Sequence, residues 1–143
     1  MCDRRDDRRD GGSVSLELAI LGPGFLLFIL AVIFGGRVAL AGQAVDQAAS
    51  EAARTASVAR SKVEADSSAQ TAAENTLRDQ HLSCDRLAVA VDTSGFSQPV
   101  GTPASVSVVV TCDVRVGDLR PAITVSRTVT GSASSPLDTY RQR

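Results

Sequence analysis

The 143-residue sequence lacks much of what catalysis and metal binding require. It contains no Trp, one His and three Cys, and aromatic residues make up only 3% of it. With so few metal ligands and acid–base groups, we expect neither enzyme activity nor a cofactor or metal. The 15 basic and 16 acidic residues nearly cancel. The chain therefore lacks the basic surface that favours nucleic acid, and we expect none to be bound directly.

The apolar residues are concentrated near the N-terminus. Residues 18–36 contain no charged side chain and hold three of the four Phe. At about 1.5 Å of helical rise per residue, this run matches the roughly 30 Å hydrocarbon core of a bilayer. A buried helix in a soluble domain is the alternative, but the Ala-, Ser- and Thr-rich remainder is too small to enclose one. The sequence therefore predicts a transmembrane helix over residues 13–40, inserted in a lipid membrane.

The flanking charges predict the orientation of this helix. Arg4, Arg5, Arg8 and Arg9 precede the apolar run, whereas Arg37 alone follows it closely. Cytoplasmic flanks carry the excess of Lys and Arg. We therefore expect a single-pass protein of the cell membrane, with a cytoplasmic N-terminus and an extracytoplasmic C-terminal domain.

The same region has some features of a cleaved signal peptide. The stretch Ala39–Ala41 has the small-x-small pattern of a cleavage site, and Gly42 follows it. Against cleavage there, the apolar run exceeds the usual 7–15 residues. Glu17 also stands at its start, and Arg37 lies between it and the cut. The sequence therefore favours an apolar helix that stays in the mature protein.

Glu17 stands where an apolar run makes a charge costly. Considered by itself, Glu17 is a solvated residue at the N-terminal end of the helix, where the helix dipole favours negative charge. However, the sequence around it resembles the processing site of type IV prepilins: a charged leader (residues 1–12), a Gly at the cut, and Glu as the fifth residue after it. The resemblance implies cleavage between Gly12 and Ser13 by a prepilin peptidase. It also implies that the Glu17 carboxylate pairs with the new N-terminal ammonium of a neighbouring subunit.

Two further features of the span concern its shape and packing. Pro23, with glycine on both sides, predicts a kink or a locally unwound stretch. Ala31, Gly35 and Ala39 recur at four-residue spacing, the small-xxx-small pattern that lets membrane helices approach closely. Chance is the alternative, since small residues are abundant throughout the chain.

Residues 41–82 predict an Ala-rich extracytoplasmic helix. No Pro or Gly occurs from Gln43 to Leu82, and Ala is the best helix former. We expect this helix to project onward from the membrane span, with a break near residues 66–68. Apolar residues at three- and four-residue steps form one narrow stripe: Ala41, Val45, Ala48, Ala52, Ala56, Ala59 and Val63.

Residues 83–143 predict a small β module, which makes the fold class α+β. The β-branched runs that predict three antiparallel strands are Leu87–Val91, Ser105–Val110 and Ile123–Val129. Antiparallel pairing of the first two would bring Cys84 close to Cys112, so we expect a disulfide, with two free thiols as the alternative. Cys2 is left in the leader, on the reducing side of the membrane.

Together these segments resemble the TadE-like minor pseudopilins of tight-adherence pili. The matching stretches are Gly12–Pro23, Gln47–Arg54 and Ser135–Arg141. The resemblance implies a non-enzymatic component of a pilus or related secretion apparatus, which packs with other pilin-like subunits and assembly proteins. Incorporation into a surface pilus stays open, as does the choice among adhesion, secretion and DNA uptake. The alternative function is a secreted or membrane-anchored module that binds an extracytoplasmic partner.

Overall fold

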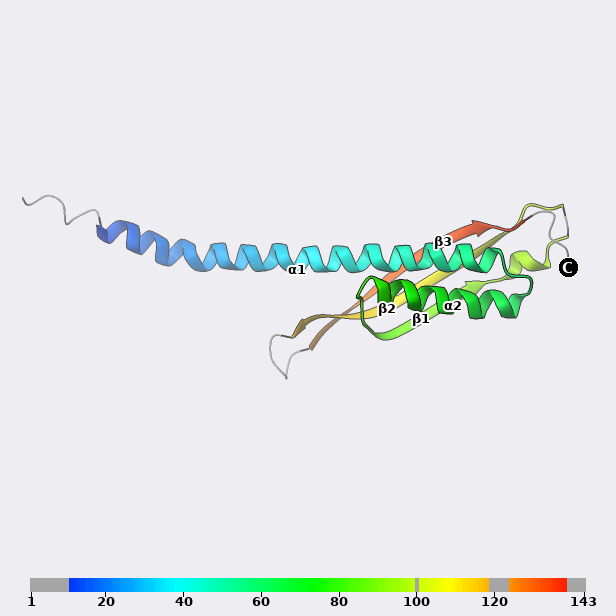
Figure 1. The fold of residues 1–143 in the computed structure, drawn as a ribbon. Coiled ribbons are helices and arrows are strands. Elements are labelled where there is room, and N and C mark those ends of the chain that lie inside the picture. The colour runs from blue at the N-terminus through cyan, green and yellow to red at the C-terminus, as the bar shows by residue number, and fades with distance from the viewer. Residues whose placement is uncertain (1–10, 100, 119–123, 139–143) are drawn as a thin grey trace, which may run out of the picture. The chain divides into compact units, whose positions relative to one another are not determined.

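The computed structural model of the protein describes residues 11–99, 101–118 and 124–138. Two helices are followed by three strands, and the chain divides into two units, Met1–Gly36 and Arg37–Arg143 (Figure 1). The predicted α+β class, with the helical part first and an antiparallel sheet after it, is confirmed. The elements are α1 (Gly11–Ser57), α2 (Lys62–Asp79), β1 (Cys84–Asp92), the 3-10 helix η1 (Ser94–Ser97), β2 (Ser105–Asp118) and β3 (Thr124–Pro136).

The apolar part of α1 stays helical through Pro23. A proline inside a helix removes one N–H donor and crowds the preceding turn. Of the two outcomes expected at Pro23, the locally unwound stretch is wrong, because all 47 residues of α1 are helical, and the kink stays a prediction. The loss of one donor leaves the hydrogen bonds of the turns before and after it in place.

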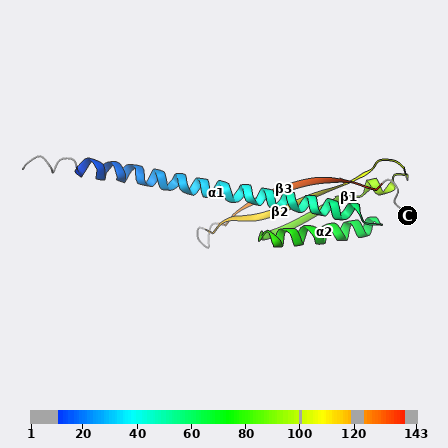
Figure 2. The same ribbon diagram turned by 45° about the horizontal axis from the view of Figure 1, so that its top comes forward.

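Helix α2 runs back alongside the last part of α1 (Figure 1 and Figure 2). A hydrogen bond from Gln80 Nε2 to Gln47 Oε1, 3.0 Å long, joins the end of this helical hairpin to α1. The break expected near residues 66–68 lies instead at residues 58–61. The expectation that the helix projects onward beyond the break is also wrong, because the chain reverses direction there.

Side-chain capping explains where the second helix starts. Ser61 is the N-cap residue, and its Oγ accepts a hydrogen bond from the Glu64 N–H at 3.2 Å. The Glu64 Oε2 in turn accepts from the Arg60 N–H at 3.0 Å. A Ser followed three residues later by Glu is the sequence pattern of a capping box. Ser61 has an extended backbone, so it lies just outside the helix, and α2 begins at the next residue, Lys62.

The helices cover one face of the sheet. Strand β2 is central and pairs antiparallel with β1 and β3, with Val110 opposite Val89 and Gly131. Every second residue of β2 from Val106 to Val114 is buried, as a strand with one covered face requires. Figure 2 shows α2 and the second half of α1 on the same side of these strands.

The predicted stripe on α1 forms the helical side of the core, except at its last member. Val63 is 78% exposed, so its inclusion in the stripe is wrong. Val63 belongs to α2, after the break between the helices. The buried face of α2 is made of other positions, which include Ala69 and Leu77. The buried members of the stripe are Ala41, Val45, Ala48, Ala52, Ala56 and Ala59.

The predicted disulfide between Cys84 and Cys112 is present. It joins the first residue of β1 to β2 across a sequence separation of 28, with the two Cα atoms 5.3 Å apart. Cys112 is fully buried in the core on the helix-covered face. Cys2 lies outside the described residues.

Candidate functional site: the exposed apolar helix

The predicted processing site lies in the first turns of α1. The helix begins at Gly11, so the Gly12–Ser13 bond is part of its first turn. The side chains of residues 11–16 lie outside the described part of the structure. Cleavage at this bond therefore remains a prediction from the sequence.

Glu17 lies one helical turn after Ser13 on the same helix. Its side chain is exposed, and it forms no hydrogen bond or ion pair with any other described residue. The charge is followed directly by the apolar run, where an unpaired carboxylate is costly once water is removed. The pairing predicted for Glu17 with a neighbouring subunit remains a prediction from the sequence.

The apolar side chains of α1 are uncovered along the whole run. From Leu18 to Phe34 their exposed fractions lie between 39% at Ile29 and 71% at Leu18. Contiguous apolar surface of this extent marks a membrane or protein contact. Among the described residues, α1 is the one helix long and apolar enough to cross a membrane.

The small-residue pattern forms an open strip on this helix. Ala31, Gly35 and Ala39 are all exposed, and their four-residue spacing keeps them close to one face of the helix. A methyl group added at Gly35 would meet no atom within 4 Å. The role of these three residues in helix packing remains a prediction from the sequence.

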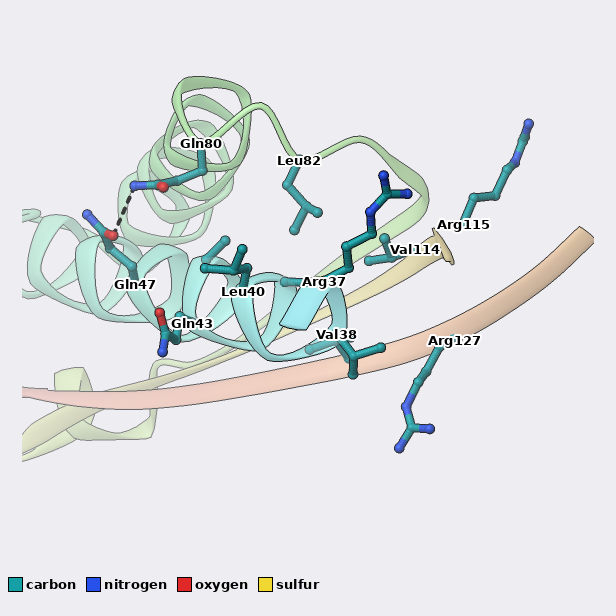
Figure 3. A pocket seen from close by; sticks show the side chains of 13 residues that line it. Arg37, Val38, Leu40, Gln43, Gln47, Gln80, Leu82, Val114, Arg115 and Arg127 are labelled. Carbon is teal, nitrogen blue, oxygen red and sulfur yellow. Dashed lines mark hydrogen bonds between the residues drawn. The ribbon is translucent and has the colours of Figure 1, made fainter. Parts of the chain in front are cut away.

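The second unit contains a cavity that the sequence did not predict. Its volume is about 420 Å³, and it lies between the start of that unit's helical part, the last part of β2 and the first part of β3 (Figure 3). Leu40, Leu82 and Val114 are among its apolar lining residues, and Arg37, Arg115 and Arg127 are its basic ones. The strand register brings Arg127 opposite Val114, a relation that no local motif reveals.

No group of three or more His, Cys, Asp or Glu side chains suited to a metal ion occurs in the described part of the chain. The arrangement that does emerge is a membrane-length helix with an uncovered apolar surface, followed by a small disulfide-bonded α+β unit. The candidate site is consequently a contact surface.

Comparison with known proteins identifies the segment that carries this surface. The model of the TadE-like protein family matches residues 12–54, which include Glu17, the small-residue strip and most of the buried Ala stripe. The predicted resemblance to the TadE-like family is confirmed over this segment, and it suggests involvement in tight-adherence pilus assembly. No curated protein and no solved structure matches the chain.

Proposed function

We propose that this protein is a non-enzymatic minor pseudopilin that takes part in assembling a tight-adherence type pilus or a related secretion apparatus. The observation that carries the proposal is the uncovered apolar surface of α1 within the segment that matches the TadE-like family. Such a surface needs lipid or other apolar helices around it. The work of the protein would be helix packing in the membrane, with its N-terminus cytoplasmic and its α+β unit extracytoplasmic.

Glu17 is the assembly charge in this proposal. Cleavage by a prepilin peptidase between Gly12 and Ser13 creates an ammonium group at Ser13. The Glu17 carboxylate of a neighbouring subunit pairs with that group, so each buried charge gains its partner only on assembly. Pairing offsets the cost of holding a carboxylate beside hydrocarbon and fixes the axial register between subunits.

Co-purification from native membranes tests this role. Glu17→Gln keeps the size and polarity of the side chain but removes its charge. We expect the variant to insert normally and to lose most of the pilin-like subunits that co-purify with the wild type. Glu51→Gln is the matched control, since Glu51 is an exposed carboxylate on the same helix beyond the apolar run.

The outcome also separates the two candidate functions. Undiminished recovery of pilin-like subunits with Glu17→Gln would contradict the assembly role of the charge. Recovery of a lone soluble ligand from the wild type, without pilin-like subunits, would instead indicate an extracytoplasmic binding module.

A further inference from the structure

The face of the sheet opposite the helices is made of small side chains. Figure 2 shows α2 and the second half of α1 on the other side of the strands. Residues that pair across neighbouring strands point to the same face of a sheet. The middle of the uncovered face therefore carries uncharged residues no larger than valine: Ala88, Ala90, Val109, Thr111, Thr130 and Ser132. No long side chain protrudes there, so this face offers an even surface to another sheet.

Two charges of opposite sign stand at the ends of this surface. Arg86 and Asp92 are exposed residues of β1, and the alternation along the strand places both on the uncovered face. The strand between them is about 20 Å long. Neither forms an ion pair with another described residue. Asp92 Oδ1 accepts a hydrogen bond from the Ser94 N–H at 2.9 Å, so its partner is a backbone amide and not a cation.

The other charges near Arg86 already have partners. Asp85 Oδ2 accepts a hydrogen bond from Arg115 Nε at 2.7 Å, and Asp113 Oδ1 accepts one from Thr128 Oγ1 at 2.6 Å. Asp113 is opposite Arg86 in the register, yet the two form no ion pair. The guanidinium of Arg86 is therefore available to a carboxylate of another molecule.

A second copy of the same face complements this arrangement of charges. Two sheets that stack face to face can be related by a two-fold axis that lies between them and crosses the strands. Such an axis reverses the strand direction and keeps each strand over its equivalent. With the axis midway between Arg86 and Asp92, each Arg86 meets Asp92 of the other copy. Asp113, at the level of Arg86, then faces the uncharged Ser107, so no like charges meet.

We propose that two copies of this chain stack through the uncovered faces of their sheets, with Arg86 of each copy paired to Asp92 of the other. The small central side chains let the sheets approach to the usual spacing of about 10 Å. The two ion pairs fix the orientation and register of the stack. The face measures about 14 Å by 20 Å, which is a contact of the weak and reversible class. Crosslinking suits a contact of this class.

Crosslinking of two differently tagged full-length copies tests the contact. One copy carries Ala88→Cys and the other Ala90→Cys, because the proposed axis places these positions against each other. Both copies also carry Cys2→Ala, and the Cys84–Cys112 disulfide leaves no further thiol. The copies are expressed together, their membranes are treated with a short bis-maleimide, and the product that carries both tags is measured.

Charge reversal decides whether the proposed pairs hold the two copies together. Arg86→Glu in both copies sets Glu against Asp at both ends, and Asp92→Arg in both sets Arg against Arg. We expect either change to lower the yield of the doubly tagged product about tenfold. Arg86→Glu in one copy and Asp92→Arg in the other restores opposite charges at both ends, and the yield should return to its original level.

Two further combinations separate the contact from an effect on folding. Asp92→Asn keeps an acceptor for the Ser94 N–H, so adding it to Arg86→Glu in both copies should recover most of the yield by removing the repulsion. Arg54→Glu reverses an exposed charge on α1, away from this face, and should leave the yield unchanged.

Three results would overturn the proposal. Equal yields in all charge combinations would show that the copies associate elsewhere, for example through α1. A yield that stays low both in the mixed copies and after addition of Asp92→Asn would exclude the proposed pairs. Crosslinking of Ala90→Cys to a different protein in native membranes, in place of the second copy, would assign the face to another subunit.

Discussion

Gly131 and Gly42 differ in what a methyl group would meet at each position. At Gly131, on β3, a Cβ would lie 2.8 Å from the Asp46 backbone nitrogen and 2.8 Å from the Val45 carbonyl carbon. Both atoms belong to the backbone of α1 and cannot move aside as a flexible side chain can. At Gly42, also on α1, nothing lies within 4 Å. Gly131 therefore sets how closely the helix packs on the sheet.

Gly131→Ala should consequently destabilise the second unit. We expect a loss of about 1–3 kcal/mol in the free energy of unfolding, the usual cost of overpacking. Chemical denaturation of the full chain in detergent, followed by circular dichroism, measures it. Gly42→Ala is the control and should be neutral or stabilising by up to about 1 kcal/mol, because Ala is the better helix former. An equal effect of the two substitutions would contradict the close approach.

His81 has a left-handed backbone conformation, with φ of 56°. Its N–H donates to the Arg78 carbonyl, and the Leu82 N–H donates to the Leu77 carbonyl, which together end α2 in the Schellman arrangement. Glycine usually occupies this position because it has no Cβ to crowd the backbone. The absence of glycine left the sequence without a clear signal for the end of α2.

His81→Gly should leave stability unchanged or raise it by up to about 1 kcal/mol, through relief of backbone strain. His81→Val should lower it by at least about 1 kcal/mol, since a β-branched residue tolerates this conformation poorly. The same unfolding experiment compares the two variants. Greater stability of the valine variant would contradict the role assigned to the turn.

Secondary-structure elements were predictable where a pattern persists over many residues. The long apolar run predicted the first half of α1, and three β-branched runs predicted the strands. The helical hairpin was missed because the Ala-rich composition favours helix on both sides of the break. The local signal for the new start is the pair Ser61 and Glu64.

The cap on α2 should therefore carry measurable stability. Ser61→Ala removes the Oγ that accepts the Glu64 N–H, and we expect a loss of about 1 kcal/mol. Ser67→Ala serves as the control, because its exposed hydroxyl bonds to a carbonyl within the helix and Ala is the better helix former there. A loss with Ser67→Ala as large as that with Ser61→Ala would argue against capping as the cause.

The disulfide between β1 and β2 supports a module that is too small to be very stable on its own. Replacing both Cys84 and Cys112 by Ala opens a loop closed over a separation of 28 residues. Loop entropy predicts a loss of about 3–4 kcal/mol. Unfolding of the oxidised wild type and the double variant measures this difference, and Cys2→Ala is the control. Equal stability of the two would contradict a structural role for the bond.

At the scale of the whole molecule, the sequence predicted the family match but not the cavity. The residues that the family model matches are contiguous in sequence: Glu17, the apolar run and most of the Ala stripe lie within residues 12–54. The cavity depends on strand register, which places Arg127 opposite Val114 and near the part of α1 that begins at Arg37. Contacts between residues so far apart in sequence leave no local pattern to read.

The most direct test of the account is the N-terminus and intact mass of the protein recovered from its native membranes. Prepilin-type processing predicts a chain that begins at Ser13 and still contains the apolar run. A chain that begins at Gly42 would contradict the account, because the helix proposed for assembly would have been removed. An uncut chain beginning at Met1 would contradict the pairing of Glu17 with a newly formed N-terminal ammonium.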